Sequence, residues 1–195
     1  MRLLNKNLVM AIELNDFIHV YDDVLDSSTC NSLIEVFESN VDKHERIENS
    51  NKPNFTQFNL TENSKITKKI EQIHNLLLSK IFQYKKKYYE FVDSRCFPSE
   101  HAFEQFRIKR YVNDGNDMFD THVDVTDHES SRRFLSFLLY LNDVDNGGET
   151  IFEGMAIKPK VGRMVVFPPL WMFPHIGTSP VSNSKYIIST YLHYK

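Results

Sequence analysis

The stretch that decides the fold is residues 134–167, FLSFLLYLNDVDNGGETIFEGMAIKPKVGRMVVF. Short apolar segments at 134–142, 150–152 and 163–167 alternate there with breaks rich in glycine, proline and asparagine. Such segments favour β-strands and such breaks favour turns. We therefore expect antiparallel strands joined by short turns, as in a β-sandwich or barrel.

The same pattern extends in both directions along the second half of the chain. Further strands are predicted at residues 102–112, 119–125 and 185–193. Polar turn signals, including Asn113-Asp114-Gly115-Asn116-Asp117, separate these segments. The half of the chain after Pro98 is accordingly expected to be mainly β.

The first half of the chain has a different spacing of apolar residues and is predicted to be mainly helical. Apolar residues recur at helical spacing in residues 31–39 and from residue 65 to about 91. Residues 17–25 predict a strand that runs into a turn. Residues 45–64 show no sustained period, so they form either a long loop or a pair of short strands, and long loops are often functional lids.

Composition indicates one folded domain and excludes several classes of protein. The chain has 195 residues, of which 41% are hydrophobic and 25% charged, so a disordered chain is excluded. We expect a single domain over 1–195, with a helical part at about 1–95 and a β core at about 96–195. A net charge of −3 gives no support for a nucleic-acid partner.

From the sequence pattern we expect neither a targeting segment nor a membrane span. No apolar run reaches the roughly 18 residues that cross a membrane, so we expect no membrane partner. Two cysteines are too few for a disulfide framework, and the expected compartment is therefore the cytoplasm. The sequence does not specify an oligomeric state.

The first chemical motif is His122-Val123-Asp124 in a predicted strand. Side chains at i and i+2 point to the same face of a strand, so an imidazole and a carboxylate converge. The motif alone is weak, because two polar residues on a surface strand give the same pattern. A second ligand-bearing segment is needed before a metal site is indicated.

That second segment is His175, 53 residues after His122, with Lys185 ten residues further on. Two histidines and one carboxylate form the facial ligand set of non-haem Fe(II) and leave positions open for a chelating co-substrate and dioxygen. A dicarboxylate chelator has a second carboxylate that needs a cation, and Lys185 can supply it. A core histidine and a solvated lysine are the alternative interpretations.

Together these motifs resemble the 2-oxoglutarate- and Fe(II)-dependent dioxygenases, and within them the prolyl 4-hydroxylase-like branch. The resemblance is strong from about residue 103 to 195 and covers the first half only in general layout. The stretches that carry it are Arg110-Tyr111, Phe119-x-x-His122-x-Asp124, residues 137–143, Gly147-Gly148-Glu149-Thr150-x-Phe152, Pro159-Lys160-x-Gly162-Arg163, His175-x-Gly177-x-x-Pro180-Val181 and Lys185-Tyr186.

The resemblance implies both a fold and a site. The fold is α+β, mainly β: a double-stranded β-helix, or jelly roll, with N-terminal supporting helices. The iron ligands are His122, Asp124 and His175, and no catalytic residue is expected beyond this metal site. Lys185 and Tyr140 are expected to bind the 2-oxoglutarate C5 carboxylate. Tyr111 resembles an active-site tyrosine on the strand that precedes the iron motif.

The activity implied by the resemblance is hydroxylation of an unactivated C–H bond with release of succinate and CO₂. The expected substrate is a proline residue in a peptide or protein. The cofactors are Fe(II), 2-oxoglutarate as co-substrate and ascorbate (vitamin C) as reductant. A hydroxylase of a free amino acid or another small molecule, and a non-catalytic metal-binding jelly-roll module, are the alternatives.

Two further expectations concern the surroundings of the site. Residues 45–64 and 113–117 are predicted to flank the mouth of the metal pocket and to be the more mobile parts of the chain, the former as a lid. Phe55 and Phe58 are predicted to pack in the core rather than to hold a ligand. Trp171, the only tryptophan, is likewise predicted to pack rather than to line a substrate groove.

Overall fold

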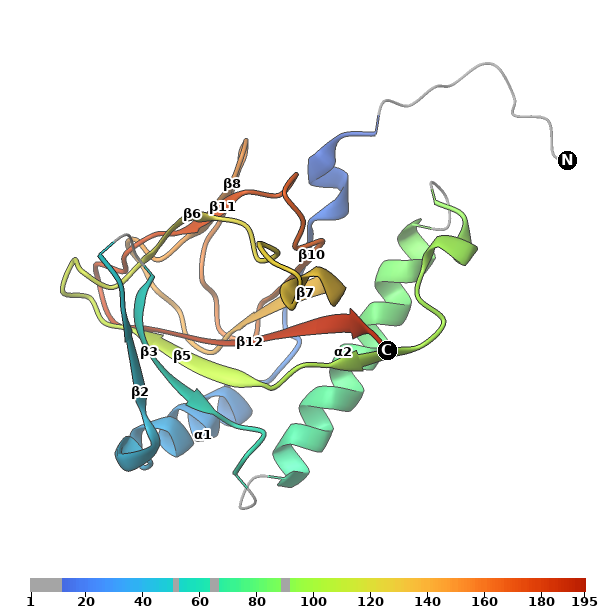
Figure 1. Cartoon of the computed structure of the whole chain (residues 1–195). Coiled ribbons are helices and arrows are strands. Elements are labelled where there is room, and N and C mark those ends of the chain that lie inside the picture. Colours follow the sequence, from blue (N-terminus) through green and yellow to red (C-terminus); the bar gives the residue numbers. More distant parts are fainter. Residues whose placement is uncertain (1–11, 51–52, 64–66, 89–91) are drawn as a thin grey trace, which may run out of the picture.

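The computed structural model describes residues 12–50, 53–63, 67–88 and 92–195, and two antiparallel β-sheets dominate it (Figure 1). The large sheet has the strand order β1-β10-β7-β12-β5-β3-β2, with β4 paired to β12. Its strands are β1 (His19–Tyr21), β2 (Glu45–Glu48), β3 (Asn54–Asn59), β4 (His101–Phe103), β5 (Arg107–Tyr111), β7 (Arg133–Tyr140), β10 (Met164–Phe167) and β12 (Lys185–Tyr194). The small sheet has the order β6-β11-β8-β9, formed by β6 (Phe119–His122), β8 (Thr150–Phe152), β9 (Met155–Ile157) and β11 (His175–Gly177).

The central strands of the large sheet are buried on both faces. In β7, Leu135, Phe137 and Leu139 belong to the core on the helix side, whereas Leu138 and Tyr140 face the small sheet. Successive side chains of a strand point to opposite faces, so a strand covered on both sides needs a continuous apolar run. This double burial explains the apolar sequence from which the strand was predicted.

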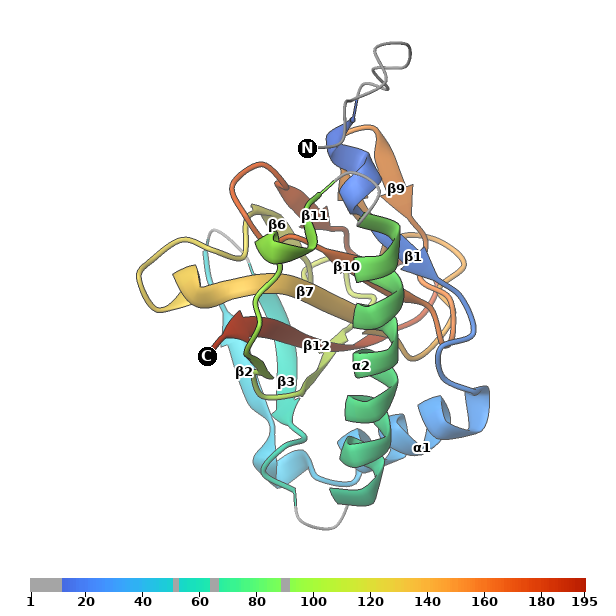
Figure 2. The ribbon, with the colours of Figure 1, turned by 90° about the vertical axis from the view of Figure 1, so that its right-hand side faces the viewer.

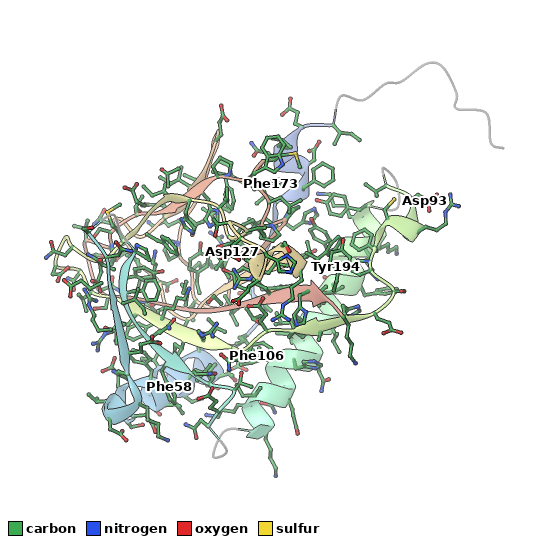
Figure 3. All side chains as sticks on the ribbon, viewed as in Figure 1. Phe58, Asp93, Phe106, Asp127, Phe173 and Tyr194 are labelled. Carbon is green, nitrogen blue, oxygen red and sulfur yellow. The ribbon has the colours of Figure 1, made fainter. Side chains whose placement is uncertain are left out.

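Two helices cover the outer face of the large sheet, and α2 crosses in front of its central strands in the view of Figure 2. They are α1 (Ser27–Glu38) and α2 (Thr67–Tyr88). The Asp26 carboxylate caps α1 by accepting a hydrogen bond of 2.8 Å from the Thr29 amide. Figure 3 shows Phe58 and Phe106 on the helix side of the sheet, in the same apolar core as the buried faces of both helices.

The short 3₁₀ turns lie at the ends of these elements. They are η1 (Leu14–Phe17), η2 (Val41–Lys43), η4 (Ser94–Cys96) and η5 (Ser130–Arg132). The predicted α+β, mainly β class with N-terminal helices is confirmed. The predicted helix from residue 65 to about 91 corresponds to α2, and residues 65–66 and 89–91 lie outside the described residues.

The first half of the chain supplies strands as well as helices. Residues 45–64 contain the hairpin β2–β3, and β3 pairs with β5 at one side of the large sheet. The second of the two sequence alternatives, a pair of short strands, is therefore correct. The segment predicted as one strand at 102–112 is two strands, β4 and β5, since residues 104–106 leave the ladder.

Aromatic residues near the motifs divide into buried and exposed ones. Phe55 and Phe58 are buried, at 4% and 3% exposure, as predicted. Trp171 is 77% exposed, so the prediction that it packs was wrong. It lies in the proline-rich loop between β10 and β11, where backbone shape rather than hydropathy decides which side chain faces inward.

In the described part of the chain, no helix has the length and apolar character needed to cross a membrane. Cys30 is buried and Cys96 is exposed, and both are free thiols. The cytoplasmic compartment stays a prediction.

Candidate active site

Pairing of two short strands brings the three proposed metal ligands together. His122 ends β6, His175 begins β11, and the two residues are partners in the antiparallel ladder. Asp124 lies two residues beyond the end of β6 rather than inside the strand. One ligand atom from each of the three residues lies within 4.8 Å of the others. The structure therefore assembles the group that the sequence predicted.

Backbone carbonyls fix the orientation of both imidazoles. Nδ1 of His122 lies 2.7 Å from the carbonyl oxygen of Asp120, and Nδ1 of His175 lies 3.1 Å from that of Phe173. A carbonyl only accepts, so each Nδ1 carries the proton and each Nε2 presents a lone pair. These Nε2 atoms lie 3.7 Å and 4.0 Å from the two carboxylate oxygens of Asp124.

Burial keeps His122 neutral. Desolvation, with a further contribution from the neighbouring His175, lowers the pKa of His122 to about 4. The Phe119 ring stacks on the His122 imidazole at a centroid distance of 3.4 Å, which holds the ring in place. Two imidazoles and a carboxylate form a donor set that suits a divalent transition-metal ion such as Fe(II).

The Asp124 carboxylate is oriented by residues that the sequence analysis did not assign. The Tyr191 hydroxyl donates a hydrogen bond of 2.9 Å to Asp124 Oδ1. Arg133 donates to the backbone carbonyl of Asp124 at 2.7 Å and lies 3.9 Å above the centre of the Tyr191 ring. Arg133 is itself held by Glu104 at 2.9 Å. The available sequence signal was alternation, which puts Tyr191 on the Lys185 face of β12.

Lys185 lies inside the fold, with an exposure of 2%. Its ammonium donates a hydrogen bond of 2.9 Å to the Gly148 carbonyl and lies 4.5 Å from the centre of the Tyr111 ring. Tyr111 is the ladder partner of Lys185 across β5 and β12. Burial lowers the pKa of Lys185 to about 7. No carboxylate of the described residues forms an ion pair of 4 Å or less with this ammonium, and Glu149 attracts it only from further away, so the buried cation is suited to an anionic ligand.

The Gly147-Gly148 turn before β8 makes this arrangement sterically feasible. Both residues have positive φ, 74° and 78°. A side chain at Gly147 would place its Cβ 2.4 Å from the Ser179 carbonyl oxygen, which no residue tolerates. Glycine at this position therefore lets the turn approach the loop before β12 and brings the Gly148 carbonyl to Lys185.

Tyr140 is separated from the pocket by the hydroxyl group of Thr150. It is fully buried, and its hydroxyl donates a hydrogen bond of 2.6 Å to Thr150 Oγ1. Thr150 lines the pocket that holds Lys185 and the triad. Tyr140 was predicted from the sequence and Thr150 was not, because a side-chain contact between β7 and β8, which lie in different sheets, leaves no local sequence pattern.

One pocket between the sheets brings most of these side chains together, and Tyr140 and Arg133 lie outside its lining. Lys185, Tyr111, Thr150 and the three candidate ligands line it together. Its apolar walls come from Phe119, Leu138 and Ile187. A second lysine, Lys109, also lines it, and burial lowers the pKa of Lys109 to about 8 while the Asp124 carboxylate opposes that shift. Phe173, whose carbonyl holds His175, lies toward η1 (Figure 3).

The expected lid is partly a fixed hairpin. Arg46 of β2 pairs with the fully buried Asp117 at 2.7 Å, and Asp117 also accepts a hydrogen bond from the Val112 amide. These contacts tie the β2–β3 hairpin to the turn at residues 113–117. Residues 51–52 at the hairpin tip lie outside the described residues, so mobility of that tip stays a prediction.

Comparisons with known proteins agree with the sequence motifs. A family model described as the 2OG-Fe(II) oxygenase superfamily matches residues 106–193. A probable prolyl 4-hydroxylase of Arabidopsis thaliana is 36% identical over 121 residues, which are 48% of this chain. The alignment spans only 41% of that relative's length.

Solved structures share the fold. A viral collagen prolyl hydroxylase from Paramecium Bursaria Chlorella virus-1 has a TM-score of 0.66 at 20% identity, covering 92% of this chain and 97% of its own. A prolyl hydroxylase from Trichoplax adhaerens, in complex with a hypoxia inducible factor peptide fragment, has a TM-score of 0.70 at 15% identity, covering 91% and 84%. The predicted jelly-roll fold is confirmed by these similarities.

Proposed function

We propose that the chain is a 2-oxoglutarate- and Fe(II)-dependent dioxygenase that hydroxylates proline in a peptide, a proposal supported by the match of residues 106–193 to the family model of the 2OG-Fe(II) oxygenase superfamily. The observation that carries this proposal is the meeting of His122, Asp124, His175 and buried Lys185 in one pocket. If Lys185 were a solvated lysine or His175 a core histidine, neither would need to lie beside the other residues of this pocket.

His122, Asp124 and His175 would hold Fe(II) through two Nε2 atoms and a carboxylate oxygen. The bound metal, with 2-oxoglutarate and dioxygen, supplies the oxidation of the C–H bond, and 2-oxoglutarate leaves as succinate and CO₂. Ascorbate is the proposed reductant that keeps the iron in the ferrous state. Tyr191 would keep one oxygen of Asp124 occupied by its hydrogen bond and thereby direct the other oxygen toward the metal.

Lys185 would bind the C5 carboxylate of 2-oxoglutarate, assisted by the Thr150 hydroxyl. In this arrangement Tyr140 donates to Thr150, so the Thr150 proton is free to be donated to the carboxylate. With a pKa near 7 in the free protein, Lys185 gains a full positive charge when the anion binds. Phe119, Leu138 and Ile187 exclude water and strengthen this pairing.

The proposal that the substrate is a proline residue in a peptide is supported by the similarity of the chain to prolyl hydroxylases. One structural neighbour is named a collagen prolyl hydroxylase, another is a prolyl hydroxylase in complex with a hypoxia inducible factor peptide fragment, and both names point to polypeptide substrates. A free amino acid remains the alternative substrate within the same chemistry. A non-catalytic metal-binding module is disfavoured, because it would have no use for the buried cation Lys185 beside the metal ligands.

The test is a coupled assay with Fe(II), 2-oxoglutarate, ascorbate and a panel of proline-containing peptides. We expect succinate in a one-to-one ratio with peptides that gain one oxygen atom on proline, as located by tandem mass spectrometry. His175→Ala should abolish both products, whereas Lys86→Met, an exposed residue on α2, should change neither. Oxygen gain by free proline alone would support the small-molecule alternative, and the absence of any metal-dependent succinate would refute the oxygenase.

A further inference from the structure

Lys109 places a second cation in the pocket. It lies on β5, two residues before Tyr111, on the face that also presents Tyr111 to the small sheet. Its ladder partner on β12 is Ile187, another pocket residue. The Lys109 ammonium lies 4.8 Å from the centre of the Phe55 ring. The pocket thus contains one lysine beside the Gly147-Gly148 turn and another beside Asp124.

Lys109 differs from its cationic neighbours because no hydrogen bond or ion pair from the described residues holds its ammonium. Arg107 donates to Gln105 at 2.6 Å, and Arg133 is paired with Glu104. Within the described ranges of the chain, Lys109 makes neither a hydrogen bond nor an ion pair of 4 Å or less. The face of the Phe55 ring attracts the ammonium but does not neutralise its charge.

The charges around Lys109 leave room for an anion. Asp124 attracts the ammonium, while Arg107 and Arg133 repel it. Once Asp124 binds a divalent metal its negative charge is offset, and the cations on that side then outnumber the available anions. Of these cations, Lys109 lines the pocket and is free to contact a ligand there.

We propose that Lys109 is an anion-binding residue that pairs with a carboxylate beside the metal ligands, at a subsite separate from Lys185. This inference rests on the proposed function, which places a metal and an acidic co-substrate in the pocket. The carboxylate has two sources: the C1 end of 2-oxoglutarate, or an acidic group of the substrate such as an aspartate, a glutamate or a free terminal carboxylate near the target proline.

The test uses the full chain loaded with Mn(II), which binds the same ligands without turnover, and measures binding by calorimetry. Lys109→Met removes the charge at similar length, Lys109→Arg keeps the charge, and Lys86→Met is the surface control. The first titrant is 2-oxoglutarate. The second titrants are proline-containing peptides, added at saturating 2-oxoglutarate in three matched pairs. The members of a pair differ by Asp or Asn before the proline, by Glu or Gln after the proline, or by a carboxylate or an amide at the C-terminus.

We expect Lys109→Met to weaken one titrant class by about tenfold, equivalent to about 1.4 kcal/mol, and Lys109→Arg to restore most of it. Weaker 2-oxoglutarate binding assigns the C1 carboxylate. A wild-type preference for the acidic member of a pair that disappears in Lys109→Met assigns the substrate carboxylate. Equal weakening of acidic and neutral peptides, or no change in either titrant, overturns the inference.

The two proposals fail separately in this design. Succinate formation by the wild-type Fe(II) protein decides whether the chain is an oxygenase at all. The acid-to-amide binding ratio with Mn(II) decides the role of Lys109 and needs no turnover. Thermal melting of each variant checks folding, and a normally folded Lys109→Arg with lost anion binding would also contradict a simple charge role.

Discussion

Replacing Lys185 with methionine is the sharpest test of the co-substrate site. The substitution nearly keeps the length of the side chain and removes the pocket-lining charge beside the Gly147-Gly148 turn. We expect a large increase in the KM for 2-oxoglutarate with little change in metal affinity, because Lys185 is not among the candidate ligands. The folded protein should be no less stable, since a buried charge has been removed.

The magnitude follows from the environment of Lys185. Removing one partner of a buried ion pair costs about 3–5 kcal/mol. The ammonium already donates to the Gly148 carbonyl at 2.9 Å, and giving up or sharing that bond offsets about 1 kcal/mol. About 2–4 kcal/mol therefore remain, which corresponds to a KM increase between about 30-fold and about 1000-fold.

The assay is succinate formation over a series of 2-oxoglutarate concentrations at about pH 7, in parallel with calorimetric binding to the Mn(II)-loaded protein. Lys185→Arg should be impaired less than Lys185→Met, because the charge is kept while the planar guanidinium needs different space. Lys86→Met serves as the matched lysine-to-methionine control. A KM for Lys185→Met within threefold of wild type would place the carboxylate elsewhere and refute the argument.

Three further predictions concern pH, the metal and the hairpin. Because burial lowers the pKa of Lys185 to about 7 and only its protonated form binds the carboxylate, the 2-oxoglutarate KM should be flat below about pH 6 and rise about tenfold per unit above about pH 8; a flat profile to pH 9 contradicts this. Tyr191→Phe removes the hydrogen bond to Asp124 and should weaken Mn(II) binding about tenfold or more, measured by calorimetry, with an unaltered affinity as the opposing result. Asp117→Asn breaks the pairing with Arg46 and should lower Tm by about 4–8 °C, from about 2 kcal/mol, in a thermal melt; an unchanged Tm would show that the clamp is not stabilising.

The sequence was sufficient for the fold class and for the residues whose roles follow from local spacing. His122 and Asp124 could be paired because a two-residue separation in extended backbone repeats the same face, even though the strand ends at His122. Lys185 could be placed inside because alternation along β12 puts it on one face with Ile187 and Tyr191. These inferences need only the period of a strand and the chemistry of the side chains.

Other features depended on which strands pair, and no local pattern encodes that. The order of β6, β11 and β8 brings Thr150 into the pocket and leaves Tyr140 behind it. The pairing of β5 with both β3 and β12 gives Lys109 its place beside Asp124, although a lysine in a strand predicts a solvent-facing position.

Sequence alone thus determined the periodicities and the types of ligand that this chain can offer, because each depends on residues close together along the backbone. Tertiary structure alone decided that Tyr191 and Arg133 orient Asp124, that Trp171 is exposed, and that β2 and β3 form an edge hairpin. Each of these outcomes depends on contacts between distant segments, whose free energy is set by packing of the whole domain rather than by local preference.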